Sequence, residues 1–394
     1  MMTRRIASCG AKAWILAVVA GASACKLNVI TSIEPPPASW DPANNTHPDS
    51  AQFRELLTRY VRLGLPGAVL LVRTPRGQWN GSAGYARVES DEPMLPTHLF
   101  HAASVTKMYM AAAVLLLAED GTIDLDAKIS TYLPEEVFRR IPNGTGATVR
   151  ELLGHRSGIP DFSGDMAYDL DFLNDPLGAY PPGRLLSYLD GQSALFAPGE
   201  GYFYSNADYY ILTLIVDRLV QGGHASVIAT RILQPLGLHD TYYKEGQGYP
   251  TPAGLVDSYQ DVAGDGRLMN VTDLMIHNDR VFMGNAGLIA SSADLAGFLD
   301  ALVGGQVVSP QSLAEMEAWS EPHRHGLGLS YLDTSYGPAI GHSGGDIGAL
   351  AQVRYFPDKD ATLVLLTNGG DSGVTDRLFG ELWAEAMDLA LGGP

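Results

Sequence analysis

The sequence is poor in cysteine and in basic residues. Its 394 residues include only two cysteines, Cys9 and Cys25, too few for a disulfide framework or a cysteine-built zinc site. Lysine and arginine number 26 against 44 acidic residues, which gives a formal net charge of −18. Such a surface repels a polyanion, so nucleic acid is excluded as an expected partner. With 46% hydrophobic residues, we expect a soluble globular protein of one large domain or two ordinary ones.

One segment is apolar enough to meet a membrane, and it lies at the N-terminus. Arg4 and Arg5 precede the stretch AWILAVVAGASA, which ends at Ala24. A short basic region, an apolar stretch and a small-residue end predict a signal peptide over 1–24. The stretch is too short to span a bilayer. We therefore expect an exported protein of the periplasm or cell envelope. Cys25 is a candidate for lipid attachment, which is the only membrane contact that we expect.

The rest of the chain divides into a tether and a folded body. Residues 25–50 are rich in proline and lack an apolar period, which predicts a Pro-rich tether. The body, 51–394, begins with apolar residues at helical spacing. Strands are predicted near 67–73, 78–86, 349–356 and 361–367, and a final helix over 373–390. This layout predicts an α+β fold with an antiparallel sheet from both chain ends, flanked by helices, and an inserted, mainly helical subdomain over roughly 120–280.

The strongest chemical signal is Ser104-Val105-Thr106-Lys107, which opens the apolar segment SVTKMYMAAAVLLLAEDG. Residues i and i+3 share one face of a helix, so the Ser104 hydroxyl and the Lys107 amine point to one place. A helix that is apolar on nearly all sides is buried, and burial lowers the pKa of a lysine. A fall in this pKa from about 10.4 towards about 7 requires a change of roughly 3 units. Lys107 is then able to accept the proton of Ser104 and activate it as a nucleophile. The structural alternative is Ser104 as a helix cap, with Lys107 extended to water.

A second candidate cluster is Tyr204-Ser205-Asn206, which precedes the apolar segment ADYYILTLIVDRLV. A tyrosine on a loop before a buried helix is able to place its phenol in a cleft. Beside a lysine the phenolate is electrostatically favoured, so Tyr204 is a candidate for proton transfer. Asn206 offers an amide to a peptide-like substrate. The alternative is that Tyr204 is a core aromatic residue.

The third cluster is Gly341-His342-Ser343-Gly344-Gly345, just before the C-terminal strands. His342 is a candidate for a hydrogen bond to substrate or for support of the proton relay. The amides of Gly345 and Ser104 are candidate donors to an oxyanion. A histidine flanked by glycines is also compatible with a purely structural role.

Ser-x-x-Lys, Tyr-x-Asn and His-x-Gly in this order resemble the three motifs of the penicillin-recognising serine hydrolases. That family includes class C β-lactamases, DD-peptidases, D-aminopeptidases and esterases. The stretches LLGHRSGIP (152–160), PLGL (235–238) and AGL (286–288) resemble the same family. The resemblance covers about residues 52–390 and implies a β-lactamase/transpeptidase-like fold.

The resemblance also implies catalytic roles. Ser104 would be the acylated nucleophile, Lys107 its base partner, and Tyr204 would handle protons in acylation and deacylation. His342 stands in place of the lysine that β-lactamases have in the third motif. This departure resembles the DD-carboxypeptidase and esterase branches, and strong β-lactamase activity is not expected.

For the substrate, the resemblance implies contacts with Asn206, Ser343 and Gly345. Carboxypeptidase relatives tend to have two hydroxyl residues where this chain has Ser343 and Gly345. Arg324 is a further candidate to meet a carboxylate, but a solvent-facing loop arginine is expected. The favoured reading is a D-alanyl-D-alanine carboxypeptidase-like peptidase acting on a small-molecule or peptide substrate, as a monomer. An esterase or weak β-lactamase of the same family and a non-enzymatic β-lactam or cell-wall sensor are the alternatives.

Two rival sites fit the sequence less well. Gly341–Gly345 also matches the G-x-S-x-G elbow of α/β-hydrolases, with Ser343 as the nucleophile. That elbow needs a following helix and a later histidine, but a strand is predicted next and no histidine follows His342. His323 and His325 form an H-x-H pair in a predicted polar loop. Asp257, Asp261 and Asp265 lack the glutamate that would close a calcium loop. We expect no metal and no cofactor.

Overall fold

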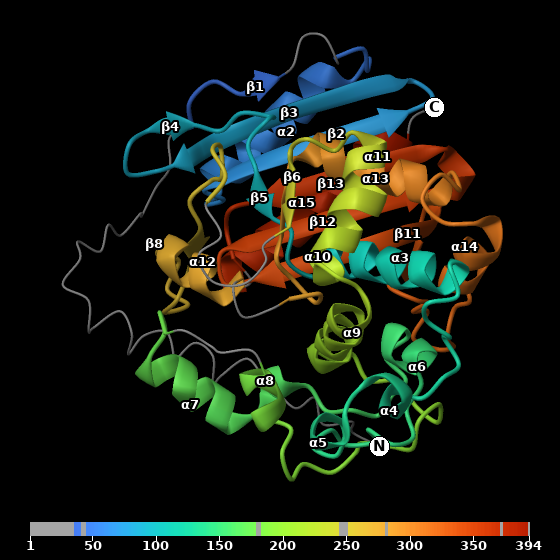
Figure 1. Cartoon of the computed structure of the whole chain (residues 1–394). Helices are drawn as coiled ribbons and strands as arrows, with labels where there is room; N and C mark the ends of the chain where they lie inside the picture. The colour runs from blue at the N-terminus through green and yellow to red at the C-terminus, as the bar shows by residue number, and fades with distance from the viewer. Residues whose placement is uncertain are drawn as a thin grey trace, which may run out of the picture.

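An antiparallel sheet is built from the two ends of the chain (Figure 1). The computed structural model describes residues 35–40, 45–178, 183–243, 251–279, 283–370 and 373–392. The predicted signal peptide and Cys25 lie outside these residues. The strand order is β1-β3-β2-β13-β12-β11-β10, and β4 pairs with β3 off this path. These strands are β1 (Ser39–Trp40), β2 (Gly67–Thr74), β3 (Gly77–Arg87), β4 (Glu92–Pro93), β10 (Ser330–Thr334), β11 (Gly337–Asp346), β12 (Ala349–Phe356) and β13 (Ala361–Thr367).

The predicted α+β fold is confirmed, with helices on both sides of the sheet. The helices are α2 (Ser50–Arg62), α3 (Thr106–Glu119), α4 (Ile129–Tyr132), α5 (Glu135–Phe138), α6 (Val149–Leu153), α7 (Met166–Asn174), α8 (Arg184–Ser187), α9 (Asn206–Leu219), α10 (Gly223–Ile228), α11 (Gln234–Leu236), α12 (Thr272–Asp279), α13 (Ser292–Val303), α14 (Pro310–Met316) and α15 (Gly373–Leu391). Shorter helical turns are η2 (Ala103–Val105), η3 (Phe162–Gly164), η4 (Ala229–Leu233) and η5 (Pro357–Lys359). Two small sheets join β5 (Phe100–His101), β9 (Leu288–Ala290) and β6 (Thr241–Tyr243), and β7 (Tyr259–Gln260) with β8 (Met269–Asn270).

The central strands are apolar on both faces because both faces are covered. On β13, Val364 and Leu366 belong to the core shared with α3 and α13. Leu363 and Leu365 belong to the core shared with the terminal helices α2 and α15. Successive side chains of a strand point to opposite faces, so a strand between two layers reads as a continuous apolar run.

The terminal helices pack together on one face of the sheet, as predicted. The buried residues of α2 are Phe53, Leu56, Leu57, Tyr60 and Val61. They recur at the spacing of one helix face. The Tyr60 hydroxyl donates to Glu385 Oε1 on α15 at 2.6 Å, which ties the two ends of the chain to each other.

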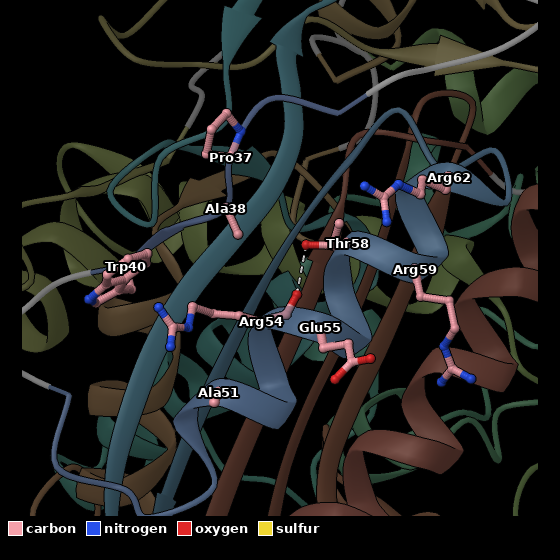
Figure 2. A pocket seen from close by; sticks show the side chains of 9 residues that line it. All are labelled: Pro37, Ala38, Trp40, Ala51, Arg54, Glu55, Thr58, Arg59 and Arg62. Atoms are coloured by element: carbon pink, nitrogen blue, oxygen red, sulfur yellow. Dashed lines mark hydrogen bonds between the residues drawn. The ribbon is translucent and has the colours of Figure 1, made fainter.

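The last part of the predicted tether lies on the folded body rather than away from it. Ser39 and Trp40 pair with Ser82 and Gly81 of β3, because an edge strand offers unpaired backbone groups to a passing segment. This segment and α2 enclose a pocket of about 540 Å³. In Figure 2 the Arg54 side chain extends from α2 toward Trp40, and its guanidinium carbon lies 4.3 Å from the Trp40 ring centroid.

The helical part of the chain lies on the other face of the sheet. Helix α3 is buried nearly throughout, and α4, α5, α7 and α8 lie furthest from the sheet (Figure 1). No single described helix has the length and apolar composition to cross a bilayer; α9 and the segment 223–236 meet the test only as a pair bent by 84°.

Strand β11 approaches the turn η2 closely enough that a side chain would not fit between them. A Cβ added to Gly344 would lie 2.3 Å from Ala102 O and 3.1 Å from Ala103 Cβ. Carbon atoms do not approach a carbonyl oxygen that closely, so glycine at 344 sets the distance between β11 and the segment that carries Ser104.

Gly344→Ala is therefore expected to force β11 away from η2, with a loss of about 1–3 kcal/mol in the free energy of unfolding. Gly380→Ala is the control, because Gly380 lies in α15 and an added Cβ meets nothing within 4 Å. That variant should be as stable as the parent, or more stable by up to about 1 kcal/mol. Urea titrations of both variants measure the effect, and equal stability of the two would contradict the argument.

Candidate active site

Ser104 lies in a short helical turn rather than in the first turn of an α-helix. The turn η2 covers Ala103–Val105, and the α-helix begins at Thr106. Ala103 has φ +46°, a left-handed conformation that costs energy for any residue with a Cβ. The Thr106 hydroxyl donates to Ala103 O at 2.7 Å and accepts the Leu288 N–H at 3.1 Å. These bonds hold the strained residue beside the candidate nucleophile.

Lys107 is completely buried beside Ser104, as the sequence predicts. Its Nζ lies 3.1 Å from Ser104 Oγ, 2.9 Å from Asn206 Oδ1 and 3.0 Å from Asn285 O. No described carboxylate forms an ion pair with it. Burial lowers the Lys107 pKa to about 7, although the carboxylates of Asp161, Asp208 and Asp346 oppose this shift. A substantial fraction of the amine is therefore neutral at neutral pH.

The arrangement around Nζ suits a neutral amine. A neutral lysine has two N–H bonds and one lone pair. The amide oxygen of Asn206 and the carbonyl of Asn285 only accept hydrogen bonds. When Lys107 is charged, its three N–H bonds can reach these two oxygens and Ser104 Oγ. When it is neutral, the two oxygens can take both N–H bonds, which leaves the lone pair for the hydroxyl of Ser104. Lys107 is thus placed to remove the Ser104 proton.

The phenol of Tyr204 lies near Ser104, and its ring centroid is 4.8 Å from Lys107 Nζ. We predicted from the sequence that the lysine favours the phenolate, and this prediction is wrong. Burial is the largest influence and raises the Tyr204 pKa well above its usual value, while the nearby Ser104 hydroxyl opposes this shift only in part. Tyr204 is a protonated phenol in the resting protein and is able to donate its proton.

Asn206, the first residue of α9, holds Lys107 in place. Its Oδ1 accepts from Lys107 at 2.9 Å, and its Nδ2 donates to Asp161 Oδ2 at 3.1 Å. The sequence analysis did not identify Asp161. The one signal for it was its position directly after LLGHRSGIP (152–160). The predicted contact of Asn206 with a substrate amide stays a prediction.

His342 is buried on β11 next to Tyr204. The two ring centroids are 6.2 Å apart. Burial lowers the His342 pKa well below its usual value, and the positive charge of Lys107 adds to this effect. His342 is therefore neutral. Ser343 and Gly345 are exposed, whereas His342 and Gly344 are buried, as the alternation of a strand requires. The predicted substrate roles of Ser343 and Gly345 stay predictions.

A second layer of buried polar groups supports the site. Two of its members, His155 and Ser157, lie in the stretch that carries the family resemblance, and the third, Asp208, was not predicted from the sequence. The Ser157 hydroxyl donates to Asp208 Oδ1 at 2.6 Å, and His155 Nδ1 lies 3.2 Å from Asp208 Oδ2. Burial raises the Asp208 pKa well above its usual value. The His155 ring centroid is 4.3 Å from that of Tyr204. His155 and Ser157 belong to LLGHRSGIP (152–160), so this stretch braces the Tyr204 ring.

The structure does not favour the rival sites. Ser343 lies within β11, and the next element is the strand β12 rather than a helix. In the described residues no group of three His, Cys, Asp or Glu side chains is arranged to hold a metal ion. Arg324 pairs with Asp333 at 2.6 Å, as befits the expected loop arginine. His323 is exposed, but His325 is buried, so the predicted polar loop is only half right.

Known proteins resemble this chain over most of its length. The family described as Beta-lactamase matches residues 53–386. Among curated proteins, Esterase EstB of Burkholderia gladioli is 28% identical over 88% of this chain and 96% of its own. Penicillin-binding protein 4* of Bacillus subtilis is 26% identical over 80% of this chain and 71% of its own. Among solved structures, a D-stereospecific amidohydrolase from Streptomyces sp. aligns with a TM-score of 0.75 and 26% identity, over 88% of this chain and all of the other.

The rate of acylation is expected to rise with pH through an apparent pKa of about 7, because only the neutral form of Lys107 accepts the Ser104 proton. Asp161 raises the pKa of Lys107. Asp161→Asn should therefore move this acid limb to lower pH. Asp120→Asn is the control, because Asp120 is exposed and pairs with Arg231.

Single-turnover rates with an activated ester, measured from about pH 5 to about pH 9, give the profiles. A flat profile for the parent chain contradicts the role of Lys107, and an Asp161→Asn profile shifted to higher pH contradicts the electrostatic argument.

Proposed function

The chain belongs to the beta-lactamase family of serine hydrolases, and we propose that it hydrolyses amide bonds next to D-amino acids through an acyl-enzyme on Ser104. The observation that carries this proposal is the set of three partners of Lys107 Nζ. Two are acceptors only, and the third is the Ser104 hydroxyl. No packing requirement explains a fully buried lysine whose lone pair faces a serine.

In the proposed acylation, Ser104 Oγ attacks the substrate carbonyl and gives its proton to Lys107. The oxyanion is held by the amides of Ser104 and Gly345, which lie on neighbouring segments because glycine at 344 lets β11 approach η2. The Tyr204 phenol donates its proton to the leaving nitrogen, and the lysine ammonium restores it. In deacylation a water attacks the ester, and the same groups move its proton to Ser104.

The substrate class follows from charge and from the relatives. The carboxylates of Asp161 and Asp346 are close enough to raise the Lys107 pKa. They favour a substrate with an ammonium group near the scissile bond over one with a carboxylate. The Streptomyces protein is a D-stereospecific amidohydrolase by its description. A D-amino-acid amide or an N-terminal D-residue of a peptide is therefore the first candidate.

A D-alanyl-D-alanine carboxypeptidase-like activity is the second candidate. The exposed hydroxyl of Ser343 at the end of β11 supports it, because a hydroxyl is able to bind a terminal carboxylate. Arg324, which the sequence suggested as a partner for the carboxylate, instead pairs with Asp333. Esterase or weak β-lactamase activity needs the same machinery, and EstB supports the former. The site residues include both Lys107 and Tyr204, which a sensor without turnover does not need.

Export and a monomeric state are part of the proposal. The support for export is the segment 1–24, and lipid attachment at Cys25 would bind the protein to the envelope. A cell-envelope location would give the protein access to peptides that contain D-amino acids.

The test is mass spectrometry of the intact protein after exposure to D-phenylalanine amide, N-acetyl-D-alanyl-D-alanine, p-nitrophenyl acetate and benzylpenicillin. An adduct on Ser104 that turns over is expected. Ser104→Ala should abolish both adduct and turnover, and Lys107→Met should slow acylation by about 10²- to 10⁴-fold.

Ser343→Ala is the matched control, since it should keep the adduct on Ser104. Full turnover by Ser104→Ala would refute the proposal. Faster hydrolysis of the acetylated dipeptide than of the amide would select the carboxypeptidase-like activity. An adduct that forms on Ser104 and is never released would identify a sensor.

A further inference from the structure

The loop between α14 and β10 points the side chain of His325 into the interior of the protein. Both the N–H and the hydroxyl of Ser320 donate to His325 O, at 3.0 and 2.9 Å. Arg324 adopts φ +49°, and its guanidinium pairs with Asp333 at 2.6 Å. A left-handed residue costs energy and persists only where its surroundings fix it. The loop is thus built to hold one conformation, in which His325 is 5% exposed.

The ring of His325 lies among the aromatic side chains of the candidate active site. Its centroid is 5.0 Å from that of His155, 5.8 Å from that of His342 and 6.1 Å from that of Tyr204, each in an edge-to-face arrangement. The rings of His155, His325 and His342 therefore surround the phenol ring of Tyr204.

The hydrogen bonds fix the tautomers of His325 and His342. His325 Nδ1 lies 3.0 Å from Gly326 O, and His342 Nδ1 is bonded to Ser343 O. A carbonyl only accepts, so Nδ1 carries the proton in both rings. Each Nε2 is then a bare acceptor, buried and without a hydrogen-bond partner among the described residues. A buried acceptor without a partner requires an explanation, such as a catalytic role or an ordered water.

His325 contributes no charge at neutral pH. Burial lowers its pKa to about 4, and the positive charges of Lys107 and Arg354 add to the effect. It therefore acts through its shape and its acceptor nitrogen and does not transfer a proton in a cationic form.

We propose that His325 is a positioning residue of the acyl-transfer site, which holds the Tyr204 phenol and the neutral imidazole of His342 in their reactive orientation. The proposal rests on the proposed role of Ser104. It assigns a function to one half of the His323/His325 pair. The other half, His323, is exposed and stacks on Tyr202 with centroids 4.5 Å apart.

The experiment compares three substitutions of His325 that keep different parts of the imidazole. Phe keeps a ring, Asn keeps a polar group near the position of Nδ1, and Gln places one near Nε2. The probe is p-nitrophenyl acetate, so the result does not depend on the natural substrate. Acylation rate, kcat, KM and melting temperature are measured for each variant, with His323→Gln as the matched control.

His325→Phe and His325→Asn should lower the acylation rate and kcat by about 10- to 100-fold, because small misplacements of reacting groups cost rates of that order. KM should change by less than about twofold, since the substrate is not bound by His325. His325→Gln should recover most of the rate, and His323→Gln should match the parent.

Parent-like acylation by folded His325→Asn would overturn the proposal, and so would equal losses in folded His325→Asn and His325→Gln. If His325→Phe fails to fold, the Asn and Gln pair decides. A double-mutant cycle with Tyr204→Phe adds a further test: the effect of His325→Asn should shrink when the phenol is absent, and full additivity would count against the proposal. Turnover by Ser104→Ala would instead refute the proposed function, which keeps the two failures distinct.

Discussion

The burial of one amine organises the catalytic region. Lys107 has no contact with water, and a charged ammonium without a carboxylate partner is costly in such a place. Hydrogen bonds to three neutral oxygens lower this cost. Burial also lowers the Lys107 pKa to about 7, so that a substantial fraction of the amine is uncharged at neutral pH. Asn206, Asn285 and the strained turn at Ala103 are needed for that arrangement. The site is thus a compromise, in which a group that opposes folding is retained for its reactivity.

The two halves of the fold meet at this amine. Ser104 and Lys107 begin the buried helix α3, Tyr204 and Asn206 precede and begin α9, and His342 lies on β11. These segments are far apart in the sequence. The sheet supplies β11, and the helical part supplies Lys107, Tyr204 and Asp161. Alignment of the reacting groups therefore depends on the contact between the layers, which Gly344 permits.

Local patterns predicted much of this structure, and the failures came from long-range burial. The spacing of Ser104 and Lys107 places the two side chains within one helical turn of each other, and the apolar residues of α3 indicate that this helix is buried. The contact and the burial were therefore both predictable. The behaviour of Tyr204 was not, because the desolvation that dominates its pKa comes from side chains distant in sequence. The only signal for Asp161 is its position after LLGHRSGIP (152–160), and no local pattern places His325 beside Tyr204. The sequence predicts a polar loop at His325. The loop instead places this side chain in the interior, because Ser320 bonds His325 O and Arg324 adopts a left-handed conformation.

The pairing of Ser39 and Trp40 with β3 places this segment far from the strand that carries His342. Strand β1 ends the sheet on one side, and β11 is five strands away along the order β1-β3-β2-β13-β12-β11. At about 4.8 Å per strand this separates the two by about 24 Å. The segment that pairs with β3 therefore lies at the other end of the strand order from β11, so a change of side chain at Ser39 or Trp40 meets no residue of the strand that carries His342.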